Sequence, residues 1–450
     1  MESNRLLFSN RQLTRLIWPL LVEQLLSVLV GMVDVLMVSF VGEATVSGVS
    51  LVDSVNHLII QVLFALTAGG TVVCARSIGA KDMPSARKGC GQLLTVTAAV
   101  MLVLAAVLLT AGRGMLHLLF GTVDTAVMND AVIYMRFTAA SFPFLAVYHA
   151  VSAAFRANGN SRISMFVSLG MNLLNIAGNA LCIFGIGWGV TGVALPTLVS
   201  RIAAAAAMGA LLQAPKNTLR LDSIRQLRPE WAILRRILSI GVPGSVESAL
   251  FNLGKVLLQS LVSTLGTASI AAYAVAGNLV TYLYLPGNAL GTAITTIAGQ
   301  CTGAGEPGQA RHYTRKLILL NYLMLLPLCA VMILWRGFWV SLYHLSAASA
   351  APAAGLLVTH ALGMILWPAA FLLPYYFRAN GRAAFSMLTA VAAMAVFRVG
   401  LAYVFVMLLH RDVLWVWYAM LLDWLFRVVV FVPAFAGRRK ACGTDPGKKR

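Results

Sequence analysis

The side chains of this sequence that could bind an ion lie inside long apolar segments. Asp34 stands in the middle of the apolar stretch 31–37, and Asn175 and Asn179 lie one helical turn apart in another. A carboxylate with amide oxygens offers the hard ligands that Na⁺ prefers, by analogy with other hard cations. These three residues therefore predict a site for Na⁺ or H⁺. The alternative is that they form interhelical hydrogen bonds that hold a bundle together.

Two further polar residues could share a cavity with this site. Glu23 lies eleven residues before Asp34, which is about three helical turns, so both acids fall on nearly one face of a helix. Asn172 belongs to the same segment as the two other asparagines. We therefore take Glu23 and Asn172 as candidates for lining a cavity or for coupling.

A second acid, Glu247, is followed eight residues later by Lys255, which lies about 80° round the same helix. A charge inside a bilayer costs at least about 2.5–3.5 kcal/mol, so each one needs a reason. Either both residues line a cavity, with Lys255 as the counter-charge of an acid, or they form a structural polar pair.

Two more pairs are spaced by one helical turn. His57 follows Asp53 and could relay protons, because its pKa lies near neutrality; alternatively the two form only a hydrogen-bonded pair. Arg427 follows Asp423 with the acid N-terminal to the base, the favoured orientation, which predicts a structural ion pair.

Sequence motifs for enzymatic chemistry are missing. The chain has no Walker motif, HExxH, GxSxG or dinucleotide-binding fingerprint, so we predict that it is not an enzyme and uses no cofactor. Its six cysteines include no CxxC pair and predict neither a metal site nor a disulfide framework. Without a nucleotide site, any transport must be driven by an ion gradient.

The composition shows which elements must position these residues. Of 450 residues, 59% are hydrophobic and 11% are charged, whereas a soluble protein carries about 25% charged residues. Twelve apolar blocks are each long enough to span a bilayer as a helix. They lie near 14–40, 45–73, 89–112, 130–155, 161–186, 189–213, 233–264, 267–301, 313–335, 353–377, 383–409 and 413–436. The chain is therefore predicted to be an all-α integral membrane protein.

The net charge of +19 is distributed in a way that argues against binding of nucleic acid. Lys and Arg concentrate at both termini and in alternate loops, and only Arg113, Arg336 and Arg411 fall in the other loops. This pattern places both termini in the cytoplasm, with the membrane lipids as neighbours of the chain.

The chain is internally duplicated. Phe-Arg-Ala-Asn-Gly at 155–159 recurs at 377–381, and at an offset of 224 Pro19 and Glu23 match Pro243 and Glu247. Six spans in each half give both halves the same orientation, as parallel repeats with a binding site between them. We predict an N-lobe at 1–212 with helices 1–6, a cytoplasmic linker at 213–229, a C-lobe at 230–437 with helices 7–12, and a basic tail at 438–450.

These features together resemble the multidrug and toxic compound extrusion (MATE) transporters over nearly the full length. The resemblance rests on Pro19 followed by Gly31-x-x-Asp34-x-x-Met37, on Gly79-Ala80 with its copy Gly303-Ala304, on the paired Phe-Arg-Ala-Asn-Gly segments, and on Leu174-Asn175-Ile176 with Asn179. It implies two six-helix lobes forming a V, and alternating access driven by Na⁺ or H⁺. It also implies that Asp34, Asn175 and Asn179 match the cation-binding positions of the family's N-lobe.

One departure concerns the C-lobe. Many members carry an acid two turns after the proline of span 7, where this chain has Phe251, while Glu247 comes one turn earlier and Lys255 follows. The resemblance implies amphipathic organic cations as typical substrates, and we expect a monomeric antiporter that exports them across a bacterial inner membrane. The alternatives are a flippase for an anionic lipid-linked precursor and a membrane receptor or scaffold that transports nothing.

Overall fold

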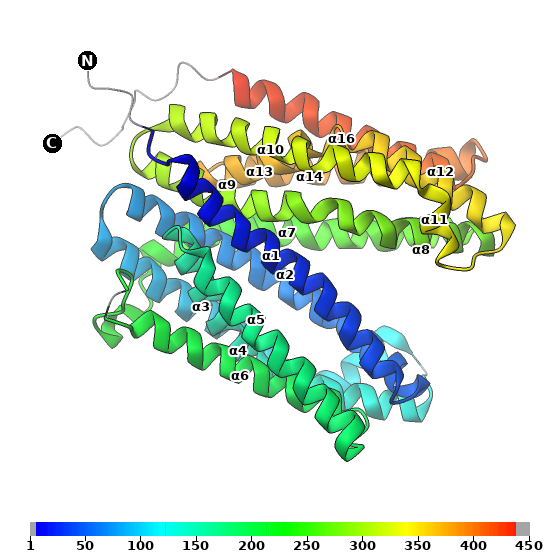
Figure 1. Ribbon diagram of the computed structural model, residues 1–450, viewed down its shortest axis with the longest axis horizontal. Coiled ribbons are helices and arrows are strands. Elements are labelled where there is room, and N and C mark those ends of the chain that lie inside the picture. Colours follow the sequence, from blue (N-terminus) through cyan, green and yellow to red (C-terminus); the bar gives the residue numbers. More distant parts are fainter. Residues whose placement is uncertain (1–5, 122, 216, 438–450) are drawn as a thin grey trace. The chain divides into compact units, whose positions relative to one another are not determined.

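The structure is a computed structural model that describes residues 6–121, 123–215 and 217–437, and these residues form helices and turns without a strand. The predicted basic tail, 438–450, lies outside the described residues. The helices, in chain order, are α1 (Asn10–Ser39), α2 (Glu43–Gly79), α3 (Met83–Phe120), α4 (Thr125–Ala157), α5 (Ser161–Ala180), η1 (Leu181–Ile186), α6 (Thr191–Gln213), η2 (Ile224–Leu227), α7 (Trp231–Ser263), α8 (Thr267–Val280), η3 (Thr281–Tyr284), α9 (Leu285–Gly303), α10 (Pro307–Leu334), α11 (Arg336–Ser341), α12 (Ala347–Gly363), α13 (Trp367–Ala379), α14 (Ala383–Ala392), η4 (Ala393–Gly400), α15 (Leu401–Tyr403), η5 (Val404–Leu408) and α16 (Val413–Ala436) (Figure 1).

The helices account for all twelve apolar blocks. Within the described residues, ten helices are long and apolar enough to cross a membrane. An eleventh block is divided between α12 and α13, which meet at an angle of 53°. The remaining block is α7, which is long enough but less apolar because Glu247 and Lys255 interrupt it.

The chain divides into two compact units that do not follow its sequence halves. Unit 1 contains Met1–Ala249, Asn288–Ala310 and Arg378–Ala384, and unit 2 contains Leu250–Gly287, Arg311–Phe377 and Phe385–Arg450. Unit 1 therefore holds the first six helices together with the first part of α7, most of α9 and short ends of other later helices.

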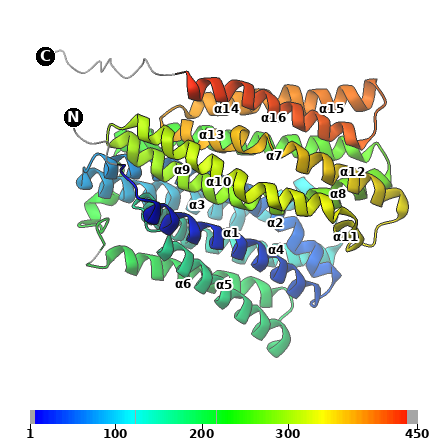
Figure 2. The same cartoon turned by 45° about the horizontal axis from the view of Figure 1, so that its top comes forward.

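In unit 1, α4 packs against α2, α3 and α6, and their buried apolar side chains form one core. Close packing depends on small residues: a Cβ atom at Gly48 of α2 would lie 2.8 Å from the carbonyl oxygen of Val127 and 2.9 Å from the amide nitrogen of Ala131. Helix α1 runs beside α5, as Figures 1 and 2 show.

The C-terminal ends of α2 and α9 cross closely within unit 1, at equivalent points of the two repeats. A Cβ at Gly79 would lie 2.0 Å from the Gln300 carbonyl oxygen, and a Cβ at Gly303 would lie 1.9 Å from the Arg76 carbonyl oxygen. Ala75 and Gly299 meet one turn earlier. Each helix thus presents two small residues four positions apart, the pattern that lets helix backbones approach in membranes. We call this contact the α2–α9 crossing.

Two side chains form hydrogen bonds that flank the α2–α9 crossing, and these side chains are likewise related by the repeat. Arg76 donates through Nε and Nη2 to the carbonyl oxygen of Ala379, at 3.0 and 2.7 Å. Gln300, which is the repeat mate of Arg76, donates through Nε2 to the carbonyl oxygen of Ala157 at 2.6 Å. Both acceptors belong to the recurring Phe-Arg-Ala-Asn-Gly segments, so the recurrence has a structural role.

In unit 2, α12 packs against α8 and α16, and α16 also packs against η4. A buried ion cluster lies there: Arg427 donates to Asp423 at 2.8 Å and Arg398 approaches the same carboxylate at 3.0 Å. The predicted Asp423–Arg427 pair is therefore confirmed, with a second arginine added to it.

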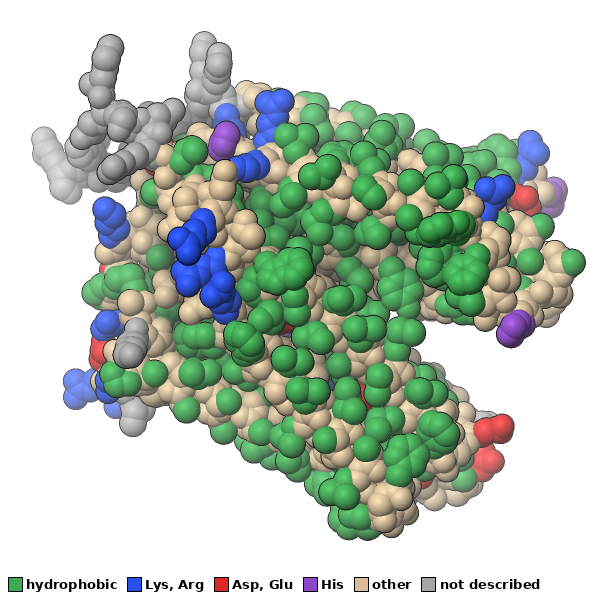
Figure 3. All heavy atoms as spheres, viewed as in Figure 1, with side chains coloured by type: hydrophobic (Ala, Val, Ile, Leu, Met, Phe, Trp, Pro, Cys, Tyr) green, Lys and Arg blue, Asp and Glu red, His purple; other side chains and the backbone are tan. Residues whose placement is uncertain are grey.

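The surface of the helices is apolar along their length. On the face drawn in Figure 3, hydrophobic side chains cover the flanks of the helices, and a cluster of basic side chains lies over the first turns of α1. Arg11, Arg15 and Arg162 line a depression at that place together with the exposed Trp18. Apolar flanks with basic helix ends are what a bilayer requires of a spanning bundle.

Candidate functional site

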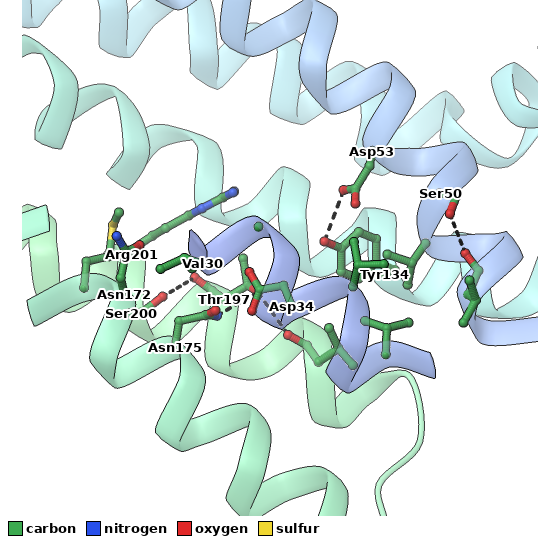
Figure 4. A pocket seen from close by; sticks show the side chains of 17 residues that line it. Val30, Asp34, Ser50, Asp53, Tyr134, Asn172, Asn175, Thr197, Ser200 and Arg201 are labelled. Atoms are coloured by element: carbon green, nitrogen blue, oxygen red, sulfur yellow. Dashed lines mark hydrogen bonds between the residues drawn. The ribbon is translucent and has the colours of Figure 1, made fainter. Parts of the chain in front are cut away.

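A polar cavity of about 380 Å³ opens between five helices of unit 1. This volume lies in the range of small-molecule sites, about 300–1,000 Å³. Figure 4 shows side chains from α1, α2, α4, α5 and α6 around it. The lining residues are Val30, Gly31, Asp34, Val35, Val38, Val46, Val49, Ser50, Asp53, Tyr134, Met171, Asn172, Asn175, Val193, Thr197, Ser200 and Arg201. Six of these 17 residues are valines and nine have polar side chains, so the wall combines apolar and polar surface.

Helices α5 and α6 lie close enough for their polar side chains to form hydrogen bonds, because α5 has a glycine, Gly178, where the two helices meet. A Cβ at Gly178 would lie 2.7 Å from the Cβ of Pro196. The next residue of α6, Thr197, bonds its own helix at the Val193 carbonyl and accepts a hydrogen bond from Asn175 Nδ2 at 3.2 Å. This packing fixes the rotamer of Asn175 beside the cavity.

The three residues of the predicted cation site meet in one chain of hydrogen bonds. Asn179 Nδ2 donates to Asp34 Oδ1 at 3.1 Å and to Asn175 Oδ1 at 3.4 Å. The other atom of that amide, Asn179 Oδ1, is buried and has no hydrogen-bond partner among the described residues. A buried polar atom without a partner needs an explanation, and a cation held between an amide oxygen and a carboxylate would supply one.

A second acid enters the cavity from α2. Asp53 Oδ1 accepts hydrogen bonds from Tyr134 Oη at 3.2 Å and from Asn56 Nδ2 at 3.4 Å. Arg201 of α6 also lines the cavity, and its Nη1 donates to Ser141 Oγ at 2.6 Å. With Asp34 and Asp53 ionised, the lining carries two negative charges and one positive charge. In that protonation state the cavity is net anionic and favours a cation.

The structure thus brings together Asp34, Asp53, Asn172, Asn175 and Asn179. It adds Tyr134, Thr197 and Arg201, which the sequence analysis did not place in the site. An arginine inside an apolar segment was a usable signal for Arg201. No signal marked the other two, because their importance depends on which helices are neighbours.

The remaining predicted residues lie elsewhere. Glu23 accepts from Ser164 Oγ at 3.4 Å and pairs with Arg156 at 3.5 Å, and its repeat mate Glu247 pairs with Arg378 at 3.4 Å. The two pairs are again equivalent in the repeat. Arg156 and Arg378 thus each pair with an acid of a membrane-spanning helix.

The last two predicted residues also lie outside the cavity lining. His57 Nε2 lies 3.3 Å from Gln61 Nε2 on the same helix. Lys255 lies in unit 2, with its Nζ 5.0 Å from the centre of the Phe251 ring.

The fold and the site together define a class: a polytopic helical membrane protein with an internal repeat and a polar cavity in its first half. The MatE family model matches the chain twice, over residues 19–181 and 243–404. The chain therefore belongs to the MATE family, and the double match confirms the internal repeat.

Curated relatives are found in bacteria. The chain is 26% identical over 295 residues to the uncharacterized transporter YisQ of Bacillus subtilis, an alignment that covers 65% of this chain and 64% of YisQ. It is 27% identical over 321 residues to the probable multidrug resistance protein YoeA of the same organism, covering 70% of this chain and 69% of YoeA. The matched stretches thus span about two thirds of these relatives. We conclude that the chain is a multi-pass protein of a bacterial inner membrane.

Solved structures of the family share the fold. A crystal structure of MATE in the bent conformation aligns with a TM-score of 0.87 at 22% identity and covers 94% of each chain. A transporter of the MOP superfamily from Pyrococcus furiosus aligns with a TM-score of 0.84 at 22% identity and also covers 94% of each chain. Among the described residues, no cluster of three or more His, Cys, Asp or Glu side chains could hold a metal ion.

Proposed function

We propose that this protein is a secondary active antiporter that exports amphipathic organic cations in exchange for Na⁺ or H⁺ by alternating access. One observation carries the proposal: Asp34 faces a net anionic cavity while the buried oxygen of Asn179, its hydrogen-bond partner, lacks a partner of its own. The names of relatives such as the probable multidrug resistance protein NorM of Thermotoga maritima support an efflux function.

The arrangement gives a physical basis for exchange. A cation bound at Asp34 would neutralise the net negative charge of the cavity and remove its attraction for an organic cation. The ion and the drug would then compete for one charge, although the drug also needs the valine-lined wall. Coupling follows when the two ligands prefer different states of the protein, because a ligand shifts an equilibrium only by its differential affinity.

The test uses the purified protein in liposomes. Ethidium movement is followed under an imposed Na⁺ gradient and then under a proton gradient alone, for the wild type and for Asp34→Asn. We expect uptake against the ethidium gradient with one of the two ions, and loss of coupled uptake in Asp34→Asn. Glu43→Gln is the matched control, because it removes one acid at the exposed start of α2, outside the cavity lining.

Two results would contradict the proposal. Coupled ethidium uptake by Asp34→Asn at the wild-type rate would show that this carboxylate is not the coupling site. No flux coupled to either ion in the wild type would refute the antiporter and favour a flippase for an anionic lipid-linked precursor. The Pyrococcus furiosus relative, for which a reversed polarity of the binding pocket suggests a different function, shows why this second candidate is kept.

Further parts of the proposal rest on the sequence. We propose that both termini lie in the cytoplasm, that the linker 213–229 joins two lobes, and that the protein acts as a monomer. The linker packs onto α3, where Gln92 Nε2 donates to the carbonyl oxygens of Gln226 and Arg228 at 3.0 and 2.7 Å. Cysteine labelling of both termini from each side of the membrane checks the orientation.

A further inference from the structure

The second half of the chain does not repeat the cation site of the first half. At the repeat offsets of 224 and 222, the mates of Asp34, Asn175 and Asn179 are Leu258, Phe397 and Leu401. All three replacements are apolar and can bind no ion. Whatever the second half contributes to substrate recognition must therefore use different chemistry.

The described membrane-spanning helices of unit 2 carry an excess of positive charge. Asp423 is the one acid between their ends, whereas the bases between their ends are three, Lys255, Arg398 and Arg427. Asp423 is 0% exposed and binds both arginines, so it compensates only one of the three cations. A cation without a counter-charge is unfavourable inside a membrane protein, where such groups mark functional sites.

Lys255, which has no ion pair among the described residues, and Arg398, which shares Asp423 with Arg427, lie beside the same aromatic ring. Lys255 Nζ lies 5.0 Å from the centre of the Phe251 ring, and the guanidinium carbon of Arg398 lies 5.2 Å from it. Arg398 is only 5% exposed and therefore belongs to the packed interior of unit 2. The Phe251 ring thus contacts Lys255 and also a buried arginine. Among the described residues, neither Lys255 Nζ nor the two terminal nitrogens of Arg398 has a hydrogen-bond acceptor. The donors available there are thus those of an ammonium and a guanidinium.

The guanidinium of Arg427, the other arginine bound to Asp423, already has further partners. Arg427 Nη2 donates to the carbonyl oxygen of Ala390 at 3.2 Å, and its guanidinium lies 4.9 Å from the Phe371 ring. Arg427 therefore serves to hold Asp423, whereas Arg398 uses only Nε for that purpose.

The backbone around Arg398 is also unusual. Arg398 lies in the π-helix η4, Ala393–Gly400, whereas the equivalent stretch 171–178 of the first half is regular α-helix. The other π-helices, η1 and η5, occupy equivalent places in the two halves. The π-helix at Arg398 is therefore specific to the second half, and π-helical turns in α-helices occur often at functional sites.

We propose that Lys255 and Arg398, which both lie beside the Phe251 ring, bind the carboxylate of a transported molecule. Substrates of this protein would then include aromatic zwitterions and organic acids, beyond simple cations. The Phe251 ring offers an apolar contact for the part of the substrate that carries the acid. This inference rests on the proposed transport function, and it assigns the recognition of the acidic group to the second half.

The test compares two ligands that differ in one charge. Equilibrium dialysis of the full-length purified protein measures binding of a zwitterionic fluoroquinolone and of its methyl ester, with ethidium as a ligand that has no acid. We expect the wild type to bind the acid about tenfold more tightly than the ester, a factor equal to about 1.4 kcal/mol. Lys255→Gln should abolish that preference without changing ethidium binding, and Lys255→Arg should restore it.

Arg398→Gln tests the second cation, and Lys255→Gln keeps the test valid if that variant fails to fold. Arg411→Gln is the matched control, because Arg411 belongs to the same unit but contacts Trp415 at 5.0 Å. Equal binding of acid and ester by the wild type would overturn the proposal. Equal weakening of all three ligands by Lys255→Gln would overturn it too, since that would show a structural role.

The outcome is separable from that of the proposed antiport. Failure of the antiport would appear as absent ion-coupled ethidium flux in liposomes. The preference for acid over ester is a binding measurement and reports on Lys255 in either case.

Discussion

Replacing Gly303 by alanine places a methyl group against the backbone of α2 at the α2–α9 crossing. The added Cβ would lie 1.9 Å from the Arg76 carbonyl oxygen and 2.8 Å from its Cα, whereas real Cβ contacts stay above 3.0 Å. The obstructing atoms belong to backbone, so no side-chain rotation relieves the clash. The two helix ends must move apart by about 1 Å, and the flanking bonds of Arg76 and Gln300 must stretch with them.

The size of the effect follows from the cost of inserting a methyl group into a packed contact, about 1–3 kcal/mol. We infer that alternating access parts and rejoins the α2–α9 crossing, so that the clash exists only while the crossing is joined. The ratio of parted to joined molecules should therefore rise about 5- to 150-fold. Gly79→Ala should act similarly, because its Cβ would lie 2.0 Å from the Gln300 carbonyl oxygen.

A natural cysteine reports on the crossing. Cys301 lies on α9 two residues before Gly303 and is 0% exposed, so its alkylation requires an opening of the structure. Its rate of reaction with N-ethylmaleimide, measured for this site by mass spectrometry, is proportional to the open population while that population is small. We expect the rate to rise by the factor given above in Gly303→Ala, and the rate at the buried Cys329 to stay constant.

Gly308→Ala is the control, since a Cβ at that nearby glycine meets no atom within 4 Å. Unchanged alkylation of Cys301 in both Gly303→Ala and Gly79→Ala would refute the reasoning. It would show that the two helix ends are already apart for most of the time.

Two further predictions concern charged groups. Asp423→Asn leaves Arg398 and Arg427 buried without a counter-charge, which should destabilise the protein by about 3–5 kcal/mol. We expect a lowered midpoint of thermal unfolding in detergent. An unchanged midpoint would show that the ion cluster does not stabilise the fold. Ser85 donates hydrogen bonds to Asp82 at the start of α3, outside the membrane, and lowers the pKa of that carboxyl. The ionised Asp82 carboxylate therefore stabilises the start of α3 fully at a pH above its ordinary pKa of about 3.9, and this stabilisation is lost as the pH falls through the lowered pKa. Amide exchange of residues 83–90 should rise over that fall in pH in the wild type. Asp82→Asn should remove this pH dependence.

The helices could be predicted because each apolar block is a local property of the chain. Burial in a bilayer requires about 20 apolar residues in a row, and that requirement is visible without knowing any neighbour. The apolar block was hardest to recognise at α7, where Glu247 and Lys255 lower the hydropathy, and at α12 and α13, where the span bends between the two helices.

The candidate site could be predicted only as far as single helices allow. Asn175 and Asn179 are neighbours on one helix, so their spacing was informative. Tyr134 and Thr197 join the site from α4 and α6, and no spacing rule relates residues on different helices. The same limit hid the bond from Gln300 to Ala157, whose residues are 143 positions apart.

The α2–α9 crossing has a consequence for the ancestry of the chain. Arg76 donates to the second copy of the Phe-Arg-Ala-Asn-Gly segment, and Gln300 donates to the first copy. Each half of the chain therefore donates a hydrogen bond to the other half and accepts one from it. Reciprocal contacts of this kind define an isologous interface, which two identical subunits form around a two-fold axis. A half-length chain with a donor at this position could close the same contact with a second copy of itself. The crossing thus has, within one polypeptide, the two-fold arrangement of a homodimer interface, with an arginine on one side where the other side has a glutamine.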